Sequence, residues 1–93
     1  MADPSLVLTL LKKDLQIMTD SRDDYLMVLL SAARDMIERE GIRLTEAEED
    51  TILHEMYAAY LYRSRLQPGP MPRMLRYGLN NRLLSQKAGE TSG

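Results

Sequence analysis

The residues best suited to acid–base chemistry are His54, its neighbour Glu55, and Asp50 one helical turn earlier. On a helix, these positions allow a hydrogen-bonded pair between the imidazole and a carboxylate. Such a pair supports catalysis only beside a nucleophile or a substrate pocket. The chain has no cysteine, no second histidine, no serine-centred nucleophile motif and no glycine-rich phosphate loop. We therefore expect His54 to be a half-exposed helical side chain in a protein that is not an enzyme, with no catalytic residue and no cofactor.

Two groups of acidic residues raise the question of a metal site. Asp20, Asp23 and Asp24 lack the twelve-residue pattern of a calcium loop, with its central glycine and closing glutamate. The acids between Glu46 and Asp50 would fan around a helix axis instead of meeting at one ion. With no cysteine and one histidine, neither a cysteine-ligated zinc site nor a histidine-rich metal site can be assembled. We predict no metal ligand.

The most informative chemistry lies in a basic segment near the C-terminus. The formal net charge is only −2, yet residues 1–62 carry −7 and residues 63–87 carry +6, with no acidic side chain among the latter. Arginine interleaved with tyrosine is typical of nucleic-acid surfaces and of protein interface hot spots. The segment could also be a solvated face, or could meet the acidic part of a neighbouring subunit. The candidate contact residues are Arg63, Arg65, Met71, Arg73, Met74, Arg76, Tyr77, Arg82 and Lys87.

Helices must position these residues. We expect a short first helix that Asp3-Pro4 opens and that ends near Gln16, although Leu6–Leu10 could instead be a short extended run. Ser21 is the expected N-cap of a second helix, in which Leu26, Leu29, Leu30, Ala33 and Ile37 share one face and which Gly41 ends.

The second half of the chain predicts two further helices. Thr45-Glu46-Ala47-Glu48 has the pattern of a capping box, and the helix that follows runs from Glu46 to Leu66. Pro68-Gly69-Pro70 must interrupt it. A final helix starts at Pro72 and ends near Lys87, with Gly78 inside it. Glycine costs about 1 kcal/mol there, which predicts a close approach to a partner helix.

We therefore predict an all-α fold: a small bundle of three long helices plus a short N-terminal helix, with the C-terminal helix set off by the Pro-Gly-Pro hinge. Residues 1–87 form one domain in which helix 72–87 is a docking arm, and residues 88–93 form a flexible tail. No stretch reaches the roughly 20 apolar residues that span a bilayer, and Leu6–Leu11 lacks a basic leader. We expect a soluble, untargeted protein.

Three stretches together resemble one known family, the head–tail connector (adaptor) proteins of tailed bacteriophages and prophages, also described as DNA-packaging proteins. The resemblance covers about residues 8 to 86. The first stretch runs from Leu15-Gln16-Ile17 through Asp20 and Asp23-Asp24-Tyr25-Leu26 to Leu29-Leu30, Ala32-Ala33 and Ile37. The other two are Tyr57-Ala58-Ala59-Tyr60-Leu61-Tyr62-Arg63 and Met71-Pro72-Arg73-Met74-Leu75-Arg76-Tyr77-Gly78-Leu79-Asn80-Asn81-Arg82-Leu83.

The resemblance implies a structural adaptor without catalytic activity that forms a homo-oligomeric ring beneath the portal protein. The ring would extend the DNA channel, contact DNA without sequence recognition, and dock a neck or tail-completion protein. The implied location is the virion neck, after synthesis in the bacterial cytoplasm, with no membrane partner. The C-terminal helix would contact the portal, and Arg73, Arg76 and Arg82 would meet the portal or face DNA.

Two alternatives remain at this stage. In the first, the chain is a small DNA-binding regulator whose basic C-terminal helix reads the major groove. The stiff linker Gln67–Met71 speaks against it, because helix-turn-helix units use a turn of about three to four residues. In the second, the chain is a helical protein–protein adaptor unrelated to phages.

Overall fold

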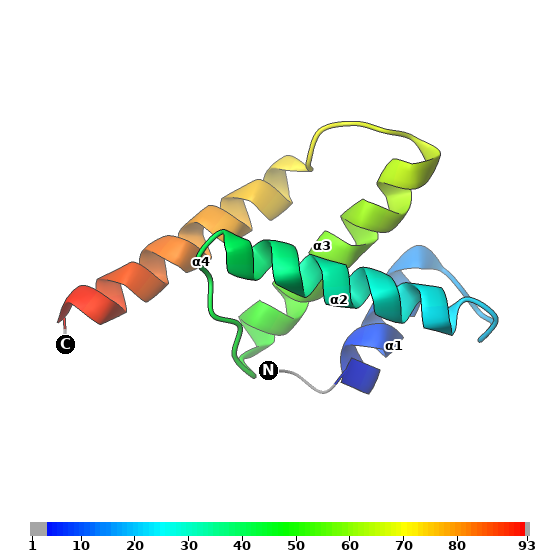
Figure 1. The fold of residues 1–93 in the computed structure, drawn as a ribbon, viewed down its shortest axis with the longest axis horizontal. Coiled ribbons are helices and arrows are strands. Elements are labelled where there is room, and N and C mark those ends of the chain that lie inside the picture. Colours follow the sequence, from blue (N-terminus) through cyan, green and yellow to red (C-terminus); the bar gives the residue numbers. More distant parts are fainter. Residues whose placement is uncertain (1–3, 93) are drawn as a thin grey trace.

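A computed structural model describes residues 4–92, and every regular element in that range is an α-helix. The helices are α1 (Pro4–Leu15), α2 (Asp23–Arg39), α3 (Glu48–Leu66) and α4 (Arg73–Ser92). The molecule measures 46 × 29 × 18 Å, and α4 runs diagonally along one side of the other three helices (Figure 1). The predicted all-α class is confirmed.

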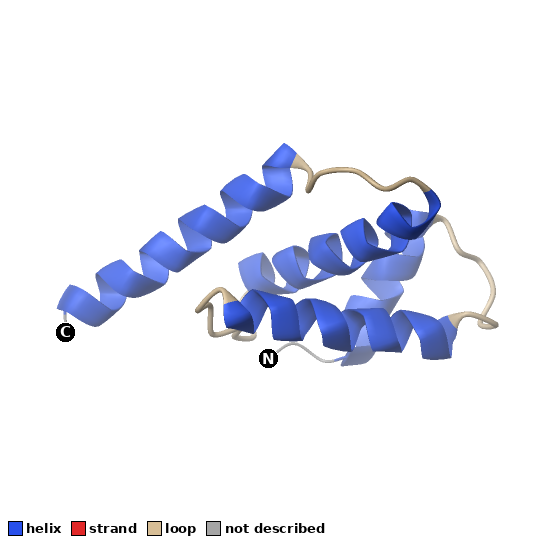
Figure 2. Cartoon of the chain, turned by 45° about the horizontal axis from the view of Figure 1, so that its top comes forward, coloured by secondary structure: helices blue, strands red, loops and turns tan. Residues whose placement is uncertain are grey.

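The central helix is α3, which contacts α1, α2 and α4. Figure 2 shows α1, α2 and α3 gathered together, with α4 beside them at the end of a long linker. Because neighbours cover α3 on several sides, its buried residues do not follow a single stripe. They are Asp50, Thr51, Leu53, His54, Tyr57, Ala58 and Ala59. The other elements supply Val7, Leu11, Leu26, Leu30, Ala33, Ile37, Ile42, Leu75 and Leu79 to the core.

The end of α1 has a left-handed residue that is not glycine. Gln16 has φ +59°, and its N–H donates to the carbonyl of Lys13. The N–H of Ile17 donates to the carbonyl of Lys12. This pair of bonds is a Schellman motif, so the predicted end near Gln16 is confirmed. The predicted opening at Asp3 lies outside the described residues.

The caps of α2 differ from the sequence prediction at one end. Arg22 occupies the N-cap position without a side-chain cap hydrogen bond, so the prediction that Ser21 caps the helix is wrong. The Ser21 hydroxyl instead lies 3.1 Å from the Thr19 hydroxyl, which draws it away from the helix amides. At the other end, Gly41 takes φ +98° and its N–H donates to the carbonyl of Glu38. The helix stop predicted at Gly41 is confirmed.

The predicted capping box at Thr45 is also wrong. α3 starts two residues later than expected, with Ala47 at the N-cap position and no side-chain cap hydrogen bond. Within the described residues, the Thr45 hydroxyl accepts only from the N–H of Ala47, over 3.2 Å, and its main partner is Asp50. The N–H and the hydroxyl of Thr45 donate to Asp50 Oδ2 over 2.6 and 2.8 Å. The physical reason is that Asp50 is buried and needs these donors.

α4 packs on the body through Leu75 and Leu79, which are both fully buried. A Cβ atom on Gly78 would lie 2.7 Å from Leu53 Cδ2, so the predicted close approach at Gly78 is confirmed, with α3 as the partner. α4 continues to Ser92, so the predicted end near Lys87 is wrong. Residues 88–92 extend the helix, and an ion pair between Arg43 and Glu90 ties this extension to the body. Gly93 lies outside the described residues.

Candidate functional site

His54 lies in the core of the bundle. Its Nε2 is 2.7 Å from the carbonyl oxygen of Leu30, to which the neutral ring donates a hydrogen bond. Burial lowers the pKa of His54, so the ring is neutral at pH 7. A hollow of about 220 Å³ adjoins it between α1, α2 and α3. The expectation of a half-exposed histidine was therefore wrong, because α3 is covered on the side that carries it.

Glu55 and Asp50, the two carboxylates near His54 in the sequence, have other partners, and Glu55 lies beside Asp14. Burial, with the Asp14 carboxylate nearby, raises the pKa of Glu55 to about 8. Hydrogen bonding with Glu55 lowers the pKa of Asp14, and Arg63 Nη2 lies 3.0 Å from Asp14 Oδ1. Arg63, the first residue of the predicted contact set, therefore joins the end of α3 to the end of α1.

Arg82 on α4 forms the most buried ion pair, with Asp50 on α3. The distance from Arg82 Nε to Asp50 Oδ1 is 2.6 Å, and the two side chains are 12% and 1% exposed. Arg82 Nη2 donates to the other Asp50 oxygen over 3.1 Å and to the carbonyl of Arg43 over 2.8 Å. Burial raises the pKa of Asp50, but the bonds from Arg82 and Thr45 outweigh it and hold that pKa below its usual value.

Arg76 joins the start of α4 to the end of α2. Its Nη1 and Nη2 donate to the two carboxylate oxygens of Glu40 over 2.9 and 3.1 Å. This bidentate geometry also fixes the orientation of the two side chains. Hydrogen bonding to Glu40 raises the pKa of Arg76. Arg76 and Arg82 therefore form ion pairs within the chain, and these pairs hold α4 against the other helices.

The outer face of α4 carries the exposed part of the predicted contact set. Met74, Tyr77 and Leu84 are 73%, 56% and 65% exposed, and Arg73 and Lys87 are exposed beside them. Residues 73, 77 and 84 are four and seven positions apart, so they point to one side of the helix. We call these five residues, together with the exposed Asn81, the outer face of α4: Arg73, Met74, Tyr77, Asn81, Leu84 and Lys87.

The remaining two candidates lie elsewhere. Met71 is half-buried against the hydrophobic core, and Arg65 lies over the ring of Tyr25 on α2, with its guanidinium carbon 4.7 Å from the ring centre. Sequence reasoning missed Leu84, although its spacing of seven from Tyr77 places both on one side of a helix. It also missed Arg22 and Tyr25, which no local pattern brings to Tyr62 and Arg65.

The two sides of α4 differ in how their charged residues are paired, which the net charge of the segment does not reveal. The inner side pairs Arg76 and Arg82 with acids of the body, while residues 63–87 themselves contain no acidic side chain. Among residues 4–92, no three histidine or acidic side chains gather in a way that could hold a metal ion. The arrangement suits binding through a helix face.

Comparisons with known proteins do not identify the chain: no family model, no curated protein and no solved structure matches it. None of the helices within the described residues is long and apolar enough to cross a membrane.

Proposed function

We propose that this chain is a structural head–tail connector of a tailed bacteriophage. Copies would assemble as a ring beneath the portal protein, extend the DNA channel, and offer a surface to a neck or tail-completion protein. The motifs between Leu15 and Leu83 support this assignment through their resemblance to the connector family. The observation that carries it in the structure is the outer face of α4.

That face has the composition of a docking surface. Arginine, tyrosine and methionine are enriched in interface cores, and a few such residues supply most of the binding free energy. α4 already buries Leu75 and Leu79 on its inner side, so Met74, Tyr77 and Leu84 form a second apolar surface, which the rest of residues 4–92 leaves exposed. We propose that the portal protein covers it.

The inner ion pairs of α4 favour the connector over the DNA-binding regulator. A recognition helix needs its cations and hydrogen-bonding side chains free to reach phosphates and base edges. Arg76 and Arg82 instead bind Glu40 and Asp50. In the connector, DNA contact would be weak, salt-dependent and independent of sequence.

Binding of the purified chain to a purified portal protein tests the proposal. We expect the triple variant M74A/Y77A/L84A to bind at least about tenfold more weakly, a loss of about 1.4 kcal/mol. The matched control is M18A/V28A/M36A, which truncates three exposed apolar side chains outside α4. Biolayer interferometry measures the affinities, and electron microscopy of the complex shows whether a coaxial ring forms.

The proposal fails if the unmodified chain does not bind the portal, or if the two triple variants lose the same affinity. Tight and sequence-selective binding to duplex DNA at physiological salt would support the regulator instead.

A further inference from the structure

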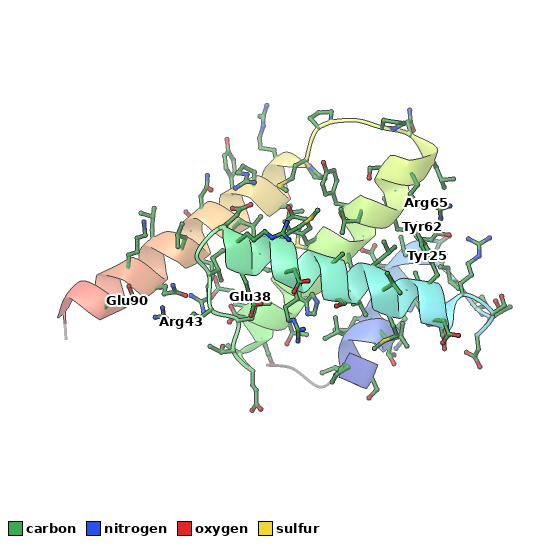
Figure 3. All side chains as sticks on the ribbon, viewed as in Figure 1. Tyr25, Glu38, Arg43, Tyr62, Arg65 and Glu90 are labelled. Carbon is green, nitrogen blue, oxygen red and sulfur yellow. The ribbon has the colours of Figure 1, made fainter. Side chains whose placement is uncertain are left out.

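Four side chains form a compact cluster at the end of the bundle where α2 begins and α3 ends. Arg65 lies over the ring of Tyr25 at 4.7 Å, and the rings of Tyr25 and Tyr62 are 6.5 Å apart between centres. Arg22 Nη1 donates a hydrogen bond to the Tyr62 hydroxyl. Figure 3 shows Tyr25, Tyr62 and Arg65 side by side. We call Arg22, Tyr25, Tyr62 and Arg65 the arginine–tyrosine surface.

The two guanidinium groups of this surface have no carboxylate partner among residues 4–92. Three of the nearby acids bind other cations: Lys12 Nζ lies 2.7 Å from Asp20 and 2.8 Å from Asp23, and Arg63 binds Asp14. Arg22 and Arg65 are both exposed, while contact with the tyrosines limits their motion. Such pre-ordered arginine donors bind carboxylates at a lower entropic cost than free side chains.

Two exposed acidic residues lie at the opposite end of α3: Glu48 is its first residue, and Glu46 lies just before it. Neither forms an ion pair within the described residues. α3 has 19 residues, so about 28 Å separates this acidic start from the helix end that carries Tyr62 and Arg65. The chain therefore has a cationic and an anionic surface at two ends of one rigid helix.

On the basis of the proposed ring function, we infer that the arginine–tyrosine surface of one copy binds the acidic residues at the start of α3, Glu46 and Glu48, of the next copy. Two different surfaces at separate ends make a head-to-tail contact, which leads to a closed ring or an open filament instead of a two-fold dimer. Arg22 and Arg65 would bind Glu46 and Glu48, and Tyr25 and Tyr62 would supply the apolar contact area. The outer face of α4 stays free for the portal.

DNA fits this surface less well than the acidic turn does. Asp20 and Asp24 are exposed next to Arg22, and an extended polyanion that reached both arginines would also meet these carboxylates. A short acidic turn needs to reach only the two guanidinium groups.

A charge-swap experiment tests the contact in the full chain. Sedimentation velocity of the unmodified protein from about 10 μM to 1 mM, the range for weak contacts, should show association that decreases as salt is raised. The variants R22E/R65E and E46R/E48R should each stay monomeric. Their equimolar mixture should associate again, because each variant then offers the charge that the other needs. Glu49 is left unchanged because its charge acts on Arg82.

The matched control for R22E/R65E is K13E/R39E, which makes the same change of net charge at two exposed residues outside both surfaces and should associate like the unmodified chain. Circular dichroism checks that every variant remains helical. Four outcomes overturn the inference: an unmodified chain that stays monomeric, single-surface variants that associate normally, a mixture that stays monomeric, or a duplex-DNA affinity that R22E/R65E abolishes while self-association persists.

Portal binding separates this contact from the proposed function. R22E/R65E keeps the outer face of α4, so it should bind the portal as a monomer. If it does so while self-association proves insensitive to the charge swap, the head-to-tail contact is wrong and the connector function stands. If self-association follows the charge swap but no form binds the portal, the connector function is wrong and the contact stands.

Discussion

Replacing Arg82 with alanine tests what holds α4 against the body. The change removes the guanidinium that donates to both oxygens of Asp50 and leaves a carboxylate that is 1% exposed without its cation. The hydrogen bonds from Thr45 to Asp50 Oδ2 remain. Asp50 Oδ1 loses its partner on a side chain that is buried in the folded protein.

The size of the effect follows from burial. Removing one partner of a buried ion pair costs about 3–5 kcal/mol, and we place R82A at about 3 kcal/mol because Thr45 still satisfies one oxygen of Asp50. The control R76A removes a similar arginine from the same helix, but its pair with Glu40 is 40% and 28% exposed. Solvent screening reduces that loss to about 1 kcal/mol. Total stabilities of small domains are only about 5–15 kcal/mol.

Urea unfolding followed by circular dichroism measures both variants. With a slope of about 1–1.5 kcal/mol per molar urea, a loss of 3 kcal/mol lowers the midpoint by about 2–3 M. The loss for R82A should shrink towards pH 4. Without its cation, the buried Asp50 takes up a proton more readily, and a neutral carboxyl is less costly to bury. The double variant D50N/R82A should be more stable than R82A at pH 7, because the unpaired charge is then gone.

Two results would refute this reasoning. If R82A were no more destabilising than R76A, burial would not control the strength of these pairs. If D50N/R82A were no more stable than R82A at neutral pH, the cost would come from lost packing of the arginine stem and not from the charge on Asp50.

Three further predictions concern local features of the bundle. Q16G should stabilise the protein by about 1 kcal/mol in urea unfolding, because glycine adopts the left-handed conformation at the end of α1 without the side-chain cost; a loss of stability would contradict this. G78A should destabilise by about 1–2 kcal/mol, because its Cβ would displace Leu53, which is buried and has little room to move, and this cost outweighs the better helix propensity of alanine. A thermal midpoint equal to or above that of the unmodified chain would show that Leu53 moves aside freely. The stability of E55Q relative to the unmodified chain should be higher at pH 8.5 than at pH 5. The folded pKa of Glu55 is about 8, above its usual 4.5, so the folded state holds the extra proton and the unmodified chain loses stability as pH rises between these values. Comparing both proteins at each pH cancels the opposite contribution of His54, and equal stability differences at the two pH values would show that Glu55 titrates normally.

The helices themselves could be read from local sequence. Periodic apolar residues predict α2, the two prolines around Gly69 separate α3 from α4, and Gly41 ends α2 as expected. The Gly78 contact could also be anticipated, because a helix tolerates an interior glycine most readily where another helix approaches closely. These features depend on backbone conformation and on neighbours within a few positions, which the sequence specifies directly.

Tertiary packing decided which charged residues remain available for partners. Arg76, Arg82 and Arg73 look alike in a basic segment, yet only the first two meet acids from α2 and α3. Packing likewise drew Thr45 from its expected cap to Asp50, and it brought Arg22 and Tyr25 to Tyr62 and Arg65 across about 40 positions of sequence. A charge pairs according to what lies within a few ångströms of it, and that distance depends on how the helices pack together.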